Sequence, residues 1–243
     1  MRIKINLICK VGALIPFDYN YNLYLNIRKV LFDYLKQHKP KYVTKYKNNF
    51  PNFTFSQLMI PKRSIEPGFL KIESTYFSIF LTSVDNRFME YIIKAFYTKM
   101  YFSIFTDKYK IMKIDIVDEP EFKSPMKFRM LSPMFLAKHK NGKITFIRAE
   151  DSDLNEYFSK ELIDNRKRYF NDKLNPDNIK LYIDQHYLES KRRTSRFFTI
   201  RNINYKTILA PIYLEGDIEL IKFAYENGVG SKTNYGFGML GLA

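Results

Sequence analysis

The sequence predicts an α+β protein made of two tandem ferredoxin-like domains, each with the element order βαββαβ. The first observation is that apolar residues alternate between strand and helix periods in this order over residues 1–120. The second is that two prolines, Pro120 and Pro125, then interrupt the chain. The third is that a similar order returns over residues 126–243, without a visible sequence repeat. We therefore expect one domain over 1–120 and another over 126–243, the second carrying a glycine-rich loop at 228–238.

In the first half, residues 2–9 alternate loosely and predict a strand. The period then becomes helical from Tyr19 to Gln37, where the apolar side includes Leu23 and Ile27. A polar, basic stretch from 38 to 52 follows, for which no element is predicted. The remaining predicted elements are strands at 53–60 and 69–84 around a Pro67-Gly68 turn, a helix capped by Asp85 or Asn86, and a strand at 110–117.

The second half begins with strand-like stretches over 127–148, where Asn141-Gly142 is a hairpin signal. A helix is predicted from Ser152 to Phe170, because early acids and late bases complement its dipole. The remaining predicted elements are strands at 179–187, 193–201 and 205–214, a helix from Ile218 to Glu226 between Asp217 and Asn227-Gly228, and a closing strand from Phe237 to Leu242.

Composition excludes several classes of protein. With 46% hydrophobic residues, the 243-residue chain is neither disordered nor collagen-like. No apolar run approaches the roughly 18 residues of a membrane helix, and the first twenty residues do not resemble a signal peptide, so a cytoplasmic protein is expected. A single cysteine excludes an internal disulfide, and three scattered histidines make no metal cluster. No metal and no cofactor are predicted.

The charge is more informative. Forty Lys and Arg against 25 Asp and Glu give a net charge of +15, which favours a phosphate-bearing partner such as nucleic acid. AT-rich coding also produces chains rich in Lys, Ile, Asn, Tyr and Phe, so composition alone does not decide. The position of the charge matters more. The tract from Arg28 to Lys47 holds seven basic residues and one acid, Asp33.

Five of the nine glycines lie in the last 16 residues. A backbone without Cβ atoms can approach a ligand closely, and successive N–H groups can bind phosphate. The order of helix, loop and strand excludes a Walker A motif and a Rossmann fingerprint. A helix C-cap followed by a tight turn is the structural alternative, although it requires only one or two of these glycines. The candidate phosphate-binding residues are Gly228, Gly230, Ser231, Lys232, Gly236 and Gly238.

The tail, Gly228-Val-Gly-Ser-Lys followed by Gly236-Phe-Gly-Met, resembles the signature of the CRISPR repeat-processing endoribonucleases of the RAMP (repeat-associated mysterious protein) superfamily. Phe53-Thr-Phe-Ser-Gln-Leu58 resembles the second strand of that family, and Leu131-Ser-Pro133 resembles the entry to its second domain. The helix from Tyr19 also fits. The resemblance implies two ferredoxin-like folds, RNA binding along a basic face, and metal-independent cleavage of precursor CRISPR RNA within each repeat.

Such cleavage needs a base near the 2′-hydroxyl, an acid near the leaving 5′-oxygen, and cations near the phosphate. Histidine suits proton transfer near neutrality, and His38 follows the first predicted helix. Many members of the family place a histidine between the first helix and the second strand, with a tyrosine on the helix and a lysine nearby. In this sequence the histidine position falls near Tyr46 or Lys47, and the tyrosine position falls near Phe32. The sequence therefore departs from the pattern of the family.

We expect His38 to be the general acid or base and Tyr46 to orient the substrate. Lys29 and Lys47 would stabilise the charge on the phosphate. Two alternatives stay open: a lysine-based site that works without histidine, and a solvated His38 at the helix end. The other histidines, His139 beside a hairpin and His186 late in a predicted strand, are weaker candidates.

A second basic cluster includes Arg192, Arg193 and Arg196, between two predicted strands of the second half. Phe197 and Phe198 adjoin it, and only one of two adjacent strand residues can face outward, so one ring could stack on an unpaired base. In the resembled family the corresponding β-hairpin often contacts RNA, so we expect RNA contact. The alternative is a solvated hairpin.

The sequence therefore favours an endoribonuclease acting on precursor CRISPR RNA. A non-catalytic RNA-binding RAMP subunit of a CRISPR effector complex is the alternative, because the family's histidine position is not occupied by histidine. Effector-complex subunits and a second copy of the chain are further candidate partners. A basic anion-binding or membrane-surface protein is disfavoured, because the charge forms no basic amphipathic helix.

Overall fold

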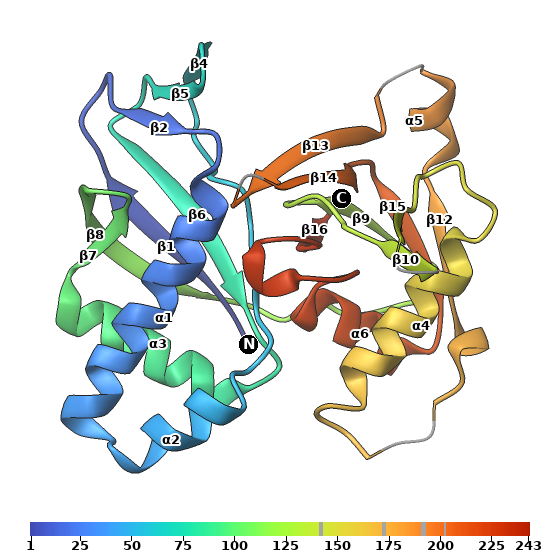
Figure 1. Ribbon diagram of the computed structural model, residues 1–243, viewed down its shortest axis with the longest axis horizontal. Helices are drawn as coiled ribbons and strands as arrows, with labels where there is room; N and C mark the ends of the chain where they lie inside the picture. The colour runs from blue at the N-terminus through green and yellow to red at the C-terminus, as the bar shows by residue number, and fades with distance from the viewer. Residues whose placement is uncertain (141–142, 172–173, 191–192, 202) are drawn as a thin grey trace. The chain divides into compact units, whose positions relative to one another are not determined.

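The computed structural model describes residues 1–140, 143–171, 174–190, 193–201 and 203–243. The chain divides into two compact units, Met1–Glu119 and Pro120–Ala243. Figure 1 shows that each unit combines β-strands with helices. The predicted α+β class is therefore confirmed, and the two units are described in turn.

The first unit is built on a five-stranded antiparallel sheet with the order β3-β6-β1-β8-β7. The edge strand β7 is an addition to this sheet. If the other four strands are numbered by their order in the chain, they lie in the sheet in the order 2-3-1-4, which is the ferredoxin-like arrangement. The strands are β1 (Arg2–Ile8), β3 (Thr54–Phe55), β6 (Tyr76–Thr82), β7 (Tyr101–Ile104) and β8 (Asp107–Val117).

Two helices pack on this sheet and on each other, α1 (Tyr19–His38) and α3 (Asn86–Lys99). Both were predicted, since their apolar residues recur at helical spacing and are buried, as Leu23 and Phe96 are. The Asp85 side chain caps α3 by accepting a hydrogen bond from the Phe88 N–H, as expected.

Other parts of the first unit differ from the prediction. The predicted strand over 69–84 is two strands, because β5 (Phe69–Ile72) pairs with β2 (Leu14–Pro16) and β4 (Arg63–Glu66) in a separate sheet. The predicted strand over 53–60 shrinks to β3 and an isolated bridge between Met59 and Ser78. A helix that the sequence did not predict, α2 (Lys41–Asn48), lies in the basic stretch after α1.

The second unit repeats the arrangement with the sheet order β12-β15-β9-β16, again 2-3-1-4. Helix α4 (Leu154–Arg166) follows the first strand and α6 (Ile218–Asn227) follows the third. The tandem ferredoxin-like prediction is thereby confirmed for this unit as well. The strands are β9 (Met126–Met130), β12 (Ile179–Ile183), β15 (Ile212–Gly216) and β16 (Leu240–Leu242).

The second unit also carries insertions between these elements. They are the pairs β10 (Ala137–Lys140) with β11 (Lys143–Phe146) and β13 (Ser195–Ile200) with β14 (Ile203–Ile208), helix α5 (Gln185–Glu189), and the short 3-10 turns η1 (Pro176–Asn178) and η2 (Thr233–Tyr235). The Asn141-Gly142 hairpin signal lies outside the described residues.

Two predicted strands of this unit are too long. The strand over 179–187 ends at Ile183, because the Asp184 side chain accepts a hydrogen bond from the Tyr187 N–H and caps α5. His186 therefore lies in a helix, and its expected place late in a strand is wrong. The strand over 205–214 divides at 209–211, because β14 pairs with β13 while β15 joins the main sheet.

Candidate functional site

The carboxyl end of α1 presents His38 to solvent. Its imidazole packs against the Tyr34 ring with 4.7 Å between centroids, and Tyr34 in turn lies 6.4 Å from Tyr91 of α3. This contact follows from the helix period, since residues 34 and 38 are one turn apart. The imidazole thus contacts an aromatic ring while the residue as a whole stays exposed.

Lys29 lies on the same helix but far from His38. They are nine positions apart, which is about 13 Å along the axis and half a turn around it. The Lys29 ammonium is exposed and contacts the Asp33 carboxylate at 2.7 Å. The two candidates therefore face opposite sides of α1, and one phosphate does not reach both in this conformation.

The other two candidates, Tyr46 and Lys47, both lie on helix α2 but differ in burial. Lys47 is exposed, whereas Tyr46 is 1% exposed and packs edge-on against Phe88 and Tyr91. The Tyr46 hydroxyl has no hydrogen-bond partner among the described residues, and burial raises its pKa. In this structure Tyr46 fills the core between α2 and α3, and its hydroxyl does not reach the surface.

Tyr42 is a polar aromatic residue that the sequence reasoning missed. A hydrogen bond links the Tyr42 and Tyr91 hydroxyls, and Arg87 donates another to Tyr42 over 3.4 Å. Together with nearby cationic charge, these contacts lower the pKa of the Tyr42 phenol. The spacing of Tyr42 and Tyr46, one helical turn apart, was the available signal.

A cation–aromatic cluster occupies another part of α1. The Arg28 guanidinium lies 4.5 Å from the Phe50 ring centroid and 5.7 Å from that of Phe32, and it donates a hydrogen bond to the Tyr24 hydroxyl. Phe32 stands where the resemblance places a tyrosine. The cluster supplies a positive charge that aromatic faces hold in position.

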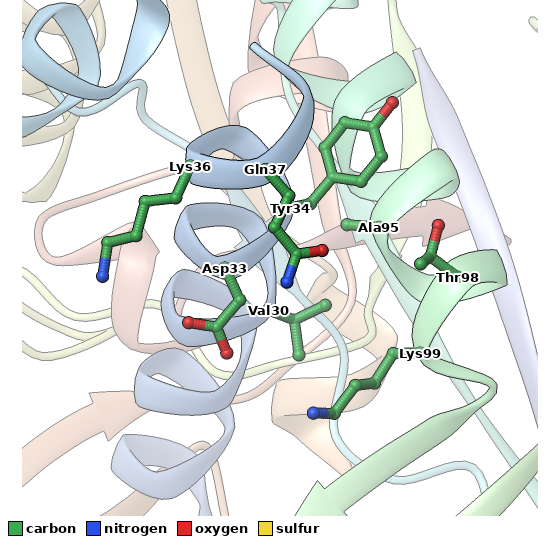
Figure 2. Close-up of a pocket in the computed structure, with 8 residues that line it drawn as sticks. All are labelled: Val30, Asp33, Tyr34, Lys36, Gln37, Ala95, Thr98 and Lys99. Atoms are coloured by element: carbon green, nitrogen blue, oxygen red, sulfur yellow. The ribbon is translucent and has the colours of Figure 1, made fainter. Parts of the chain in front are cut away.

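A hollow of about 240 Å³ lies between α1 and α3, beside the Lys29–Asp33 pair. Figure 2 shows Tyr34 extending toward α3, while Lys36 extends to the other side of α1. Polar and charged groups surround the opening, namely Asp33, Tyr34, Lys36, Gln37, Thr98 and Lys99. The hollow is small, and His38 is not among the residues that line it.

In the second unit, the β13–β14 pair carries the second basic cluster. Arg193 and Arg196 are exposed, and Arg192 lies outside the described residues. The expected division of the two phenylalanines is confirmed: Phe197 is 71% exposed, whereas Phe198 packs against Phe237 at 5.8 Å. An exposed ring on this strand pair can stack on a base, and the exposed arginines of the same segment can contact phosphate.

The glycine-rich loop connects α6 to β16 and folds onto its own unit. Its backbone is held by the Gly238 N–H, which donates to Pro133, and by the Ser231 N–H, which donates to Phe135. A Cβ on Gly238 would lie 1.8 Å from the Val229 carbonyl oxygen, and one on Gly230 would lie 2.5 Å from that of Phe135. These glycines, like Gly228 and Gly236, are buried. The close approach that they permit is to protein backbone.

Lys232 is the exposed cation of this loop. Its backbone is left-handed, with φ of 57°, and its ammonium lies 5.8 Å from the centroids of both Tyr205 and Tyr235. Ser231 is half-buried beside it. The part of the loop that can meet a ligand is therefore its tip, at 231–235, and not the glycines on either side.

The described residues lack two further features. No group of three or more His, Cys, Asp or Glu residues is placed to hold a metal ion there. No helix in the same part of the chain is long and apolar enough to cross a bilayer.

Comparison with known proteins identifies relatives along the whole chain. A Cas6-like protein of Pyrococcus furiosus, described as a putative CRISPR-associated endoribonuclease-like protein, is 27% identical over 99% of this chain and 98% of its own length. A protein of Methanocaldococcus jannaschii described as CRISPR-associated endoribonuclease Cas6 1 is 26% identical over 99% of this chain and 92% of its own.

Solved structures share the fold. The product of a Cas6-related gene from Pyrococcus furiosus superposes with a TM-score of 0.84 at 24% identity, covering 100% of this chain and 98% of that one. A RAMP protein described as binding different RNA substrates gives a TM-score of 0.83 at 22% identity, covering 100% and 99%.

The family description "CRISPR associated protein Cas6, C-terminal" matches residues 117–242, which is more than half of the chain. This match spans the glycine-rich tail on which the resemblance rested. The chain therefore belongs to the Cas6 family of CRISPR-associated proteins.

Proposed function

We propose that this protein is an endoribonuclease that cleaves precursor CRISPR RNA within its repeats. The observation that carries the proposal is family membership, together with full-length relatives named as CRISPR-associated endoribonucleases. An exposed imidazole at the end of α1, beside a strongly basic tract, provides a group suited to proton transfer at neutral pH.

The proposed reaction needs no metal. The 2′-oxygen of one nucleotide attacks the adjacent phosphorus, the bond from phosphorus to the 5′-oxygen breaks, and a 2′,3′-cyclic phosphate and a 5′-hydroxyl result. A base takes the 2′-hydroxyl proton, and an acid gives a proton to the departing oxygen. His38 would serve as one of these groups, and Lys47 would stabilise the charge that develops on the phosphate.

The glycine-rich tail and the β13–β14 pair would hold the RNA. Lys232 and Ser231 at the tip of the loop, and Arg193 and Arg196 on the strand pair, are the exposed groups available for phosphate contacts. The buried glycines would act indirectly, by letting the loop fold so that this tip is presented.

A second candidate function has its own support. His38 and Lys29 face opposite sides of α1 and Tyr46 is buried, so the predicted catalytic residues do not form one cluster. This arrangement favours a non-catalytic subunit that binds RNA, alone, as a dimer or in an effector complex.

Labelled repeat RNA incubated with the protein in EDTA distinguishes the two. Product ending in a 2′,3′-cyclic phosphate supports the endoribonuclease, and loss of cleavage in EDTA contradicts the metal-independent mechanism. A mobility shift with intact RNA, with and without added Mg²⁺, supports the binding subunit instead.

A further inference from the structure

A hollow of about 740 Å³ lies at one end of the sheet of the first unit. Its walls are the end of β1 with the chain that follows it, at residues 8–13, and the β7–β8 hairpin. Figure 1 shows the backbone of these elements. All of its lining residues belong to this unit, and none is among the predicted catalytic or RNA-binding groups. The volume falls within the range of about 300–1,000 Å³ typical of sites for small ligands.

The charge of the hollow favours an anion. Lys10, Lys108 and Lys110 line it, all three are exposed, and none has an ion-pair partner within the part of the chain that the structure describes. Asp107 is the acidic residue of the lining. Lysine ammonium groups on separate segments that face one opening repel each other, and a phosphate would relieve that repulsion.

Aromatic and apolar side chains lie next to these cations. Tyr101 is 45% exposed, and Val11 is 54% exposed on the opposite wall. A flat, half-exposed ring beside unpaired lysines matches the two parts of a nucleotide, because the base can stack while the phosphate is bound.

A buried polar group also lies in the lining. Tyr109 is 4% exposed, and its ring packs edge-on against Phe77 with 5.0 Å between centroids. Burial is the main cause that raises the pKa of this phenol, and the neighbouring Asp107 carboxylate raises it further. The one acidic group of the lining thus interacts with Tyr109, and the three lysine ammonium groups remain as the charges that an anion would meet.

We propose that this hollow is a nucleotide-binding subsite, in which one unpaired nucleotide of the bound RNA stacks on Tyr101 and places its phosphate among Lys10, Lys108 and Lys110. The subsite rests on the proposed RNA-binding function and extends it, because none of its lining residues is among the predicted catalytic or RNA-binding residues. It anchors the RNA away from the cleaved bond, so it contributes to affinity and not to the chemical step.

The chain itself provides a probe of occupancy. Cys9 is the only cysteine of the sequence, it lines the hollow, and its thiol donates a hydrogen bond to the Ser74 carbonyl oxygen at 3.2 Å. Burial raises the pKa of this thiol, so alkylation with iodoacetamide is followed at alkaline pH, where the thiolate forms. Binding of the same single-stranded repeat RNA is measured in parallel by fluorescence anisotropy.

With RNA at about ten times its dissociation constant, roughly one hollow in ten stays empty, so alkylation of Cys9 should slow about tenfold. RNA that binds and is cleaved while Cys9 reacts at its unprotected rate overturns the subsite alone. RNA that does not bind overturns both the subsite and the proposed function. A Cys9→Ser, Thr98→Cys variant, labelled on α3, is the control, and its reaction should not slow.

A second test does not depend on the thiol. The Lys108→Ala, Lys110→Ala variant should bind RNA more weakly, and its slope of log affinity against log salt should be smaller by about 0.7 for each phosphate that the two lysines bind. The Lys94→Ala, Lys99→Ala variant removes the same charge from α3 and should keep the original slope. Cleavage at saturating enzyme should be unchanged in both. Equal slopes for the two variants contradict the subsite.

Discussion

The side chains expected to act on the scissile phosphate lie in different surroundings, and these surroundings decide what each can do. His38 and Lys47 are exposed and have no ion-pair partner among the described residues. Lys29 is paired with Asp33, but a surface pair of this kind contributes only about 0–1 kcal/mol and can open when a phosphate approaches. Tyr46 is the exception, since reaching it would require α2 to move.

His38→Ala should slow cleavage by on the order of 10²–10⁴-fold with little change in RNA affinity, because a positioned acid or base acts mainly on the transition state. The measurement is single-turnover cleavage of repeat RNA at saturating enzyme in EDTA. Lys47→Ala, assayed in the same way, tests the lysine-based alternative, in which the lysine variant is the slower of the two.

His186→Ala is the matched control, because His186 is also exposed but lies on α5 of the other unit. Its rate should equal that of the unmodified protein. If His38→Ala and Lys47→Ala both cleave at the normal rate, the proposed catalytic residues are wrong.

Tyr46→Phe should raise the free energy of unfolding by about 1 kcal/mol, because it removes a buried hydroxyl that lacks a partner. Tyr19→Phe is the opposite control: the Tyr19 hydroxyl accepts a hydrogen bond from the buried Leu58 N–H, so its loss should destabilise the fold by about 1–3 kcal/mol. Urea unfolding measures both. A large loss of cleavage in stable Tyr46→Phe would instead support the orienting role expected from the sequence.

At the scale of elements, the glycines of the loop serve packing, because their backbone lies against other backbone of the same unit. Gly238→Ala should destabilise the second unit by well over 1 kcal/mol, because the backbone φ is +72° and the new Cβ would meet the Val229 carbonyl. Gly12→Ala shares the left-handed φ, at +88°, but has open space around it, so it isolates the cost of the backbone conformation. Thermal unfolding that shifts equally for both variants would contradict the packing role.

The long helices were predictable and the strand boundaries were not. Helices α1, α3, α4 and α6 each carry several turns of apolar periodicity, and Asp85 and Asp217 are caps that a sequence displays directly. Strand ends depend on which strand pairs with which. The chain from 69 to 82 reads as one strand, and only the pairing of β5 with β2 and of β6 with β1 divides it.

Helix α2 was missed for a related reason. It is eight residues long and mostly polar, and Tyr46 is its single buried residue. A helix of this length holds too few apolar residues for a helical period to be recognised in the sequence. Most of its stability must come from aromatic packing against α3, which the local sequence does not encode. The prediction of the candidate site was incomplete for the same reason, because the burial of Tyr46 and the pairing of Tyr42 with Arg87 both depend on this helix.

On the second unit, a local rule was sufficient. Adjacent residues on a strand face opposite sides, and this alone predicts that one of Phe197 and Phe198 is exposed. Whether two residues that are distant in the sequence lie close together can be decided only from the fold. The glycine spacing marked the loop, but only the structure shows that its glycines meet backbone carbonyls.

At the scale of the whole molecule, the net charge of +15 is the property that bears on RNA. Exposed cations without an ion-pair partner among the described residues occur on both units, at Lys47 and Lys108 on the first and at Arg193 and Arg196 on the second. A polyanion that contacts several of these groups releases counterions, so binding should be governed by salt more than by any single residue.

Log affinity for single-stranded repeat RNA should therefore fall linearly with log salt concentration, by about 0.7 for each phosphate contact. If both arginines of the β13–β14 pair contact phosphate, Arg193→Ala with Arg196→Ala should reduce the slope by about 1.4. Lys160→Ala with Arg168→Ala removes two exposed charges from the same unit, at and just after α4, and should leave the slope unchanged. Fluorescence anisotropy over a salt series measures all three proteins. Equal reductions in both variants would mean that the RNA senses only the total charge of the unit, and an unchanged slope in the arginine variant would place the RNA elsewhere.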